Sequence, residues 1–204
     1  MTERELTPEE KQELSKHDVH FTTLLKIYGG TKGFLYSPFF WIAFGSSLLF
    51  IALNSMIKGI NEYLLILKIK DLLLSTFPSI LGFNIGAYAL VIGFGDKEVL
   101  DKIRNADGEN GYSLFQTIGG TFAVSVLIQA TTFMLSFIID IFIYSWGDLN
   151  ILSLSETSII CINRIIAFII LFAAIYSTIL IPKIVLNVFS FSQLYHFFSK
   201  NTPP

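Results

Sequence analysis

Polar side chains recur at regular intervals along one of the most apolar stretches of the chain. They are Thr121, Ser125, Gln129, Thr132 and Ser136. Steps of four, four, three and four residues place them on one face of a helix. Hydroxyl and amide groups at membrane depth either bond to a neighbouring helix or line a water-filled path. The spacing therefore predicts a polar stripe that is a packed helix interface or, alternatively, the wall of a pore formed by several copies. Asn84, in another apolar stretch, is an amide of the same kind.

Two charged residues, Asp140 and Arg164, lie close to the ends of apolar stretches. A charge at membrane depth is costly unless it is paired, so we expect these two side chains to form an ion pair. The alternative is a gate or sensing element whose pairing responds to a disturbance of the membrane.

Small side chains form a third pattern, with Gly82, Gly86, Ala89 and Gly93 at steps of four, three and four residues. Such a face lets another helix backbone approach closely. We interpret it as a helix interface, either within the chain or between the subunits of a homo-oligomer.

Residues with the usual chemistry of enzymes are scarce. Cys161 is the single cysteine, and the His17-x-x-His20 pair supplies only two of the ligands that a zinc site needs. Phosphate-binding glycine loops and a nucleophile elbow are absent from the sequence, and the net charge of −2 gives no basic footprint for nucleic acid. We therefore expect no catalytic residue, no cofactor, no metal and no direct contact with nucleic acid.

The elements that carry these residues are long and apolar. Hydrophobic residues make up 52% of the 204-residue chain and charged residues 15%, against about 25% charged in soluble domains. Four apolar runs, near residues 39–57, 72–94, 114–139 and 159–181, are long enough to cross a hydrocarbon core of ~30 Å as helices. The predicted fold class is an all-α polytopic integral membrane protein with four transmembrane helices, short loops and a helical C-terminal extension.

The remaining segments divide the chain into three parts. Residues 1–37 form an N-terminal segment with a short helix that begins near Thr7, and residues 38–182 form the transmembrane domain with a polar loop at 96–112. Residues 183–204 form a C-terminal helix that extends the fourth span or lies at the interface, with a kink at Pro182 favoured. Residues 58–71 are interpreted as a re-entrant or interfacial piece, with an alternating strand over residues 65–69 left open.

The positions of the cations predict orientation. Ten lysines and arginines flank the spans on the side of the two termini and the 96–112 loop, against three on the opposite side. The positive-inside tendency therefore places both termini in the cytoplasm.

Residues 78–98, PSILGFNIGAYALVIGFGDKE, resemble the glycine-rich second helix of small bacterial four-span proteins, some of them encoded in phage-defence loci. In size, span number and charged cytoplasmic loop, the chain is similar to the KwaA-like membrane subunits of the Kiwa phage-defence system. This resemblance implies an oligomeric sensor of envelope disturbance in the bacterial inner membrane that works with a cytosolic DNA-binding partner. It assigns no individual functional residue.

These patterns favour a non-enzymatic membrane sensor or scaffold. We expect a homo-oligomer in contact with membrane lipids, whose cytoplasmic face (residues 1–37, 96–112 and 183–204) recruits or controls a cytosolic protein partner. The alternative is a pore-forming or ion-conducting effector, favoured by the polar stripe. A transporter subunit would show internal repeats with broken helices at matching places, whereas Pro78 and Pro182 are at unmatched positions.

Overall fold

The computed structural model describes residues 21–57, 59–93, 97–108, 111–146 and 155–200. Its elements are the helices α2 (Phe21–Ile27), α3 (Gly30–Leu35), α4 (Pro38–Met56), α5 (Glu62–Gly93), α6 (Lys97–Asn105), α7 (Leu114–Trp146) and α8 (Glu156–Lys200). The described residues contain no strand, only an isolated bridge between Asp107 and Ser113. The all-α prediction is confirmed for this part of the chain. The predicted helix near Thr7, together with His17 and His20, lies outside it.

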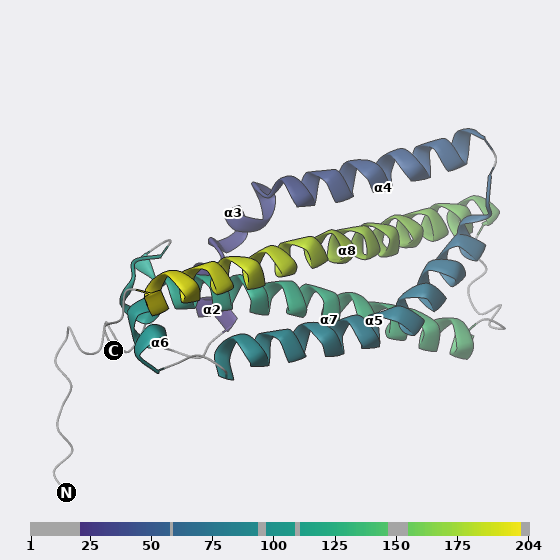
Figure 1. Ribbon diagram of the computed structural model, residues 1–204. Coiled ribbons are helices and arrows are strands. Elements are labelled where there is room, and N and C mark those ends of the chain that lie inside the picture. The colour runs from purple at the N-terminus through teal and green to yellow at the C-terminus, as the bar shows by residue number, and fades with distance from the viewer. Residues whose placement is uncertain (1–20, 58, 94–96, 109–110, 147–154, 201–204) are drawn as a thin grey trace, which may run out of the picture.

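Four long helices run side by side in alternating directions (Figure 1). Helix α8 is the central element, because it packs against α4, α5 and α7. Helices α2, α3 and α6 gather at the end of the bundle where α8 finishes, while α4 and α7 finish at the opposite end (Figure 1). The short elements therefore form a cap over one end, which we call the cap end.

Three of the helices are long and apolar enough to cross a membrane, namely α4, α7 and α8. The fourth predicted span corresponds to the C-terminal two-thirds of α5, whose first turns carry Lys68, Lys70 and Asp71. Three such helices agree with the prediction of a membrane protein. A membrane crossing by α5 stays a prediction.

The bundle exposes many large apolar side chains and buries several polar ones. Polar residues such as Ser47, Ser125 and Gln129 are fully buried within a largely apolar interior, whereas Phe83 is 70% exposed and Leu48 53% exposed. An extensive apolar exterior is stable where the surroundings are themselves apolar. Lipid is the environment that fits this surface.

Residues 62–71 are the first turns of α5, so neither a separate re-entrant piece nor a strand over residues 65–69 forms. This segment is helical, and its buried apolar side chains lie on one side of the helix. Leu65, Ile66, Ile69 and Leu73 pack into a core against α8. Packing against a neighbouring helix has overridden the weak local pattern. Helix α5 bends in its N-terminal half (Figure 1) and contains Pro78, which has no N–H to donate to the preceding turn.

Helix α8 continues through Pro182 to Lys200 without a sharp bend (Figure 1). The predicted kink is therefore absent, and the extension of the fourth span is the alternative that forms. Beyond Pro182 the helix packs on α6, where Phe191 joins a core with Val99, Leu100 and Ile103. This contact provides the reason, since the amphipathic α6 holds the end of α8 in line.

The N-terminal helices reach α7 through a close contact. A side-chain carbon added to Gly120 would lie 2.4 Å from a methyl group of Ile27, so α2 packs where α7 has no side chain. Gly29 takes a left-handed conformation, with φ of 97°, and turns the chain from α2 into α3. These two glycines bring Tyr28 to the edge of the bundle.

Candidate functional site

A polar seam joins α5, α7 and α8 in the interior of the bundle. The Asn84 side chain donates to the Gln129 carboxamide oxygen at 2.6 Å, and Gln129 donates from its nitrogen to the backbone oxygen of Ser177 at 3.2 Å. All three residues are essentially inaccessible. Each amide thus has a partner on another helix, and the seam fixes the three helices in register.

The other residues of the predicted stripe flank Gln129 along α7. Their hydroxyl groups donate to the backbone carbonyl four residues earlier in the helix, at 2.9 to 3.0 Å, in Thr121, Ser125, Thr132 and Ser136. Ser125, Thr132 and Ser136 are buried. These hydroxyl groups therefore find hydrogen-bond acceptors within α7 itself. The stripe faces the packed interior of a single chain.

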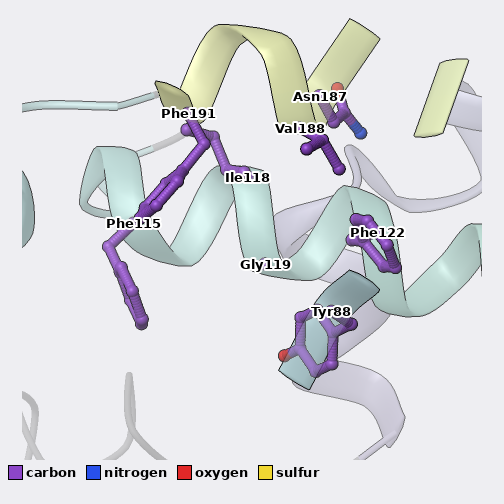
Figure 2. Close-up of a pocket in the computed structure, with 8 residues that line it drawn as sticks. All are labelled: Tyr88, Phe115, Ile118, Gly119, Phe122, Asn187, Val188 and Phe191. Atoms are coloured by element: carbon purple, nitrogen blue, oxygen red, sulfur yellow. The ribbon is translucent and has the colours of Figure 1, made fainter. Parts of the chain in front are cut away.

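The interior near the cap end is filled by aromatic rings. Tyr88 of α5 stacks on Phe122 of α7 with ring centroids 5.1 Å apart, and Figure 2 shows the pair beside Gly119 while Val188 and Phe191 approach from α8. The cavity between them has a volume of about 10 Å³, at the lower limit for one water molecule. The space between Tyr88, Phe122 and α8 is therefore filled by side chains.

Asp140 and Arg164 do not pair with each other. Asp140 lies 2.5 Å from the amino group of Lys70, which also contacts Asp71 at 2.8 Å. Arg164 instead donates twice to one carboxylate oxygen of Glu62, at 2.9 and 3.2 Å. The expected pair is thus replaced by two pairs, and both partners come from α5.

The geometry of α5 explains this exchange of partners. Glu62 and Lys70 are eight residues apart, which separates them by about 80° around a helix. One side chain can therefore face α8 while the other faces α7. The hydrogen bonds from Arg164 lower the pKa of the Glu62 carboxyl below its ordinary value. Sequence analysis missed these partners because it did not extend α5 back to residue 62.

The face of small residues on α5 points away from the rest of the chain. A side-chain carbon added at Gly82, Gly86 or Gly93 would meet no atom within 4 Å, and Ala89 is exposed. The packing of this face within the chain, one of the two expectations, is therefore not seen among the described residues. Asn84 projects inward from the same helix. Helix α5 therefore carries a polar residue on its inner face and small residues on its outer face.

A second polar cluster at the cap end has no counterpart in the sequence expectations. Lys183 donates to the Tyr28 hydroxyl at 3.0 Å and lies 4.5 Å from the centre of its ring. Lys183 and Tyr28 are 155 residues apart in the sequence. No periodic pattern signals a contact of this range.

Groups suited to metal chemistry do not assemble in the described ranges. No three histidine, cysteine, aspartate or glutamate residues there lie close enough to hold a metal ion. What the arrangement provides is hydrogen bonding, ion pairing and helix contact.

The described residues form an all-helical bundle with a polar seam in a largely apolar interior, and three of its helices are long and apolar enough to span a membrane. In comparisons with known protein families, curated proteins and solved structures, the chain has no significant match.

Proposed function

We propose that the protein is a non-enzymatic membrane sensor or scaffold that assembles into a homo-oligomer and controls a cytosolic protein partner. In this proposal α5 is a fourth span, both termini face the cytoplasm and the membrane is the bacterial inner membrane. The resemblance to the Kiwa membrane subunits, stated above, makes phage defence the proposed setting.

The bare glycine face of α5 is the observation that carries the proposal. Hydrophobic burial contributes little to association in lipid, so helices associate there through close backbone contact, and small residues permit that contact. Gly82 and Gly86 have space that none of the described helices fills. A second copy of the chain is the partner that such a face accommodates best.

The cap end supports the recruitment of a soluble partner. Helix α6 buries Val99, Leu100 and Ile103 against α8 and α7, while Asp101 and Arg104 on its other side are about half exposed. Helix α8 has a length of about 68 Å at the usual rise per residue, roughly twice a hydrocarbon core. Its last turns therefore have the length to hold α6 clear of the membrane.

The pore alternative has less support, because the polar stripe bonds within one chain and the interior at Tyr88 and Phe122 is packed. Planar bilayer recordings on purified protein test it. We expect no current from the wild type. A current that Gln129→Leu abolishes would contradict the sensor proposal and establish the pore.

Chemical cross-linking in membranes tests the oligomer. Gly86→Ile adds bulk to the bare face, and we expect it to remove the cross-linked oligomer while the thermal stability of the subunit stays close to that of the wild type. Gly45→Ile is the matched control, because Gly45 on α4 also has no atom within 4 Å of the added carbon. Equal cross-linking in both variants would contradict the α5 interface.

A photoreactive amino acid in living cells tests the recruitment. At Asp101, on the exposed side of α6, we expect it to cross-link a soluble protein. At Tyr144, which is 93% exposed at the opposite end of the bundle, the same group serves as the control. Capture of one soluble protein from both positions, or from neither, would refute a partner at the cap end.

A further inference from the structure

A pocket of mixed polarity lies at the cap end, between the N-terminal helices, the start of α7 and the second half of α8. Its volume is about 470 Å³, within the ~300–1,000 Å³ range of small-ligand sites. Ile27, Phe39 and Ile118 contribute apolar walls. The polar lining includes Tyr28, Ser37, Thr117, Thr121, Lys183 and Asn187.

Lys183 gives the pocket a positive charge that the described residues do not neutralise. Its amino group contacts the hydroxyl and the ring of Tyr28, and none of the ion pairs among the described residues includes it. An ammonium group has three protons to donate. With one donated to Tyr28, two remain for a ligand.

Two further polar side chains line the same pocket. The Asn187 amide nitrogen is buried and has no hydrogen-bond partner among the described residues, although a buried polar group is normally paired. The Tyr28 hydroxyl accepts the bond from Lys183 and also interacts with the Tyr176 hydroxyl. Asn187 is one helical turn beyond Lys183 on α8, which places both on one side of that helix. A cation and an amide donor without an acceptor thus line one pocket.

The pocket lies at the level where a lipid headgroup would be. The uncharged run of α8 that follows Arg164 ends at Lys183, although apolar side chains such as Leu186 stay exposed beyond it. Helix α4 begins beside the pocket at Pro38. Trp41 donates its ring N–H to the Leu35 backbone oxygen at 2.7 Å, and such aromatic residues are typical of the membrane–water interface. An oxyanion attached to an apolar body would meet the donors and the apolar walls together.

We propose that this pocket binds the phosphate ester of an anionic phospholipid through the Lys183 ammonium group and the Asn187 amide. A phosphate diester carries one negative charge and several acceptor oxygens, which matches one ammonium group and one neutral donor. The apolar walls would cover the glycerol and the first methylenes of the chains. The site is independent of the proposed sensor function, since it involves neither the glycine face of α5 nor a soluble partner.

Native mass spectrometry of the full chain in a neutral detergent tests the site. Phosphatidylglycerol is titrated against phosphatidylcholine, which carries the same phosphate but no net charge. We expect retention of phosphatidylglycerol in preference to phosphatidylcholine, and about a tenfold weaker affinity in Lys183→Gln, the usual effect of losing one charge-assisted bond. Lys200→Gln, which removes an exposed cation from the same helix, should bind like the wild type.

Further variants separate loss of the site from loss of the fold. Lys183→Arg retains the charge and should retain binding, while Asn187→Leu keeps the cation and should weaken binding less than Lys183→Gln does. Glycerol 1-phosphate, added without lipid, identifies the source of the phosphate. Lys183-dependent binding of it at similar affinity would support a phosphate site that takes a soluble ester. Binding of phosphatidylglycerol that is equal in the wild type and in Lys183→Gln would overturn the proposal.

Discussion

Gln129 uses both ends of its side-chain amide within the bundle, accepting from Asn84 of α5 and donating to the backbone of α8. Because the surroundings are apolar, the loss of either bond leaves a buried polar group without a partner. The stability of the bundle should therefore be sensitive to this residue.

We predict that Gln129→Leu lowers the free energy of unfolding in detergent by about 1–3 kcal/mol, because the Asn84 amide loses its acceptor. Thermal unfolding followed by circular dichroism measures the change. Thr131→Val is the control, since Thr131 is exposed and its hydroxyl bonds only within α7. The double variant Asn84→Leu/Gln129→Leu should lose less free energy of unfolding than the two single variants lose in sum. The reason is that neither amide then remains without its partner. Additive losses would contradict the pairing.

The contact between Glu62 and Arg164 should make stability depend on pH. The pKa of Glu62 is lower in the folded protein than its ordinary value of 4.5, so the contact stabilises the fold above that value. The stabilisation is lost as pH falls through the lowered pKa. Because Arg164 is 42% exposed, solvent limits the effect to about 1 kcal/mol or less.

We therefore predict that Glu62→Gln is less stable than the wild type at neutral pH and that the difference disappears at acidic pH, once the pH is below the lowered pKa of Glu62. Melting curves of both proteins, recorded from neutral to acidic pH, measure the difference in stability. The other acidic residues are the same in both proteins, so their contribution cancels in the comparison. A constant difference at every pH would show that the Glu62 carboxylate does not interact with Arg164 as a charge.

Helix α6 contributes at the scale of an element. It has nine residues, too few for an isolated helix to be stable in water, so its stability comes from the apolar side against α8. Ile103 is completely buried there and contacts the core that includes Phe191. The same contact supports the last turns of α8.

We predict that Ile103→Ala removes about 2–5 kcal/mol of local stability. Hydrogen exchange should become faster in α6 and in α8 after Pro182, while residues around Gln129 keep their protection. Lys97→Ala, an exposed change in the same helix, should leave exchange unaltered. If Ile103→Ala accelerated exchange equally throughout, the cap would not be a separate unit.

For the whole molecule, the side of the membrane on which each helix ends depends on how many helices cross the membrane. Helices α4, α7 and α8 have the length and composition of spans. If α5 also crosses, the end of α4 and the end of α7 lie together on one side of the membrane, and α6 with the end of α8 on the other. If α5 does not cross, Met56 and Asp101 share a side.

Cysteine labelling in intact cells distinguishes these topologies. Cys161 is exposed, so Cys161→Ser provides the background. We predict that Met56→Cys and Tyr144→Cys react with an impermeant reagent from outside, whereas Asp101→Cys and Lys200→Cys react only after permeabilisation. Reaction of the Met56 and Asp101 positions from the same side would exclude four crossings.

The helical fold, the inward polar face of α7 and the inward Asn84 could be predicted from the sequence, because helical periodicity and apolar length are local properties. The continuity of α8 through Pro182 and the helical state of residues 62–71 could not, since packing against α6 and α8 decided them. The prediction of an ion pair between Asp140 and Arg164 was wrong for a related reason. Both charged residues could be recognised in the sequence. Their partners, Lys70 and Glu62, come from α5, and the position of α5 beside α7 and α8 is decided by packing.

Long apolar helices with polar side chains on defined faces follow from the amino-acid sequence, since each helix satisfies its own backbone and its side-chain period is a local property. Which of those faces meet depends on the packing of the helices against one another. This packing placed Gln129 between Asn84 and Ser177, left the glycines of α5 bare, and brought Tyr28 to Lys183. The physical reason is that partner choice between helices depends on close packing and pairing across distant segments, which have no local period.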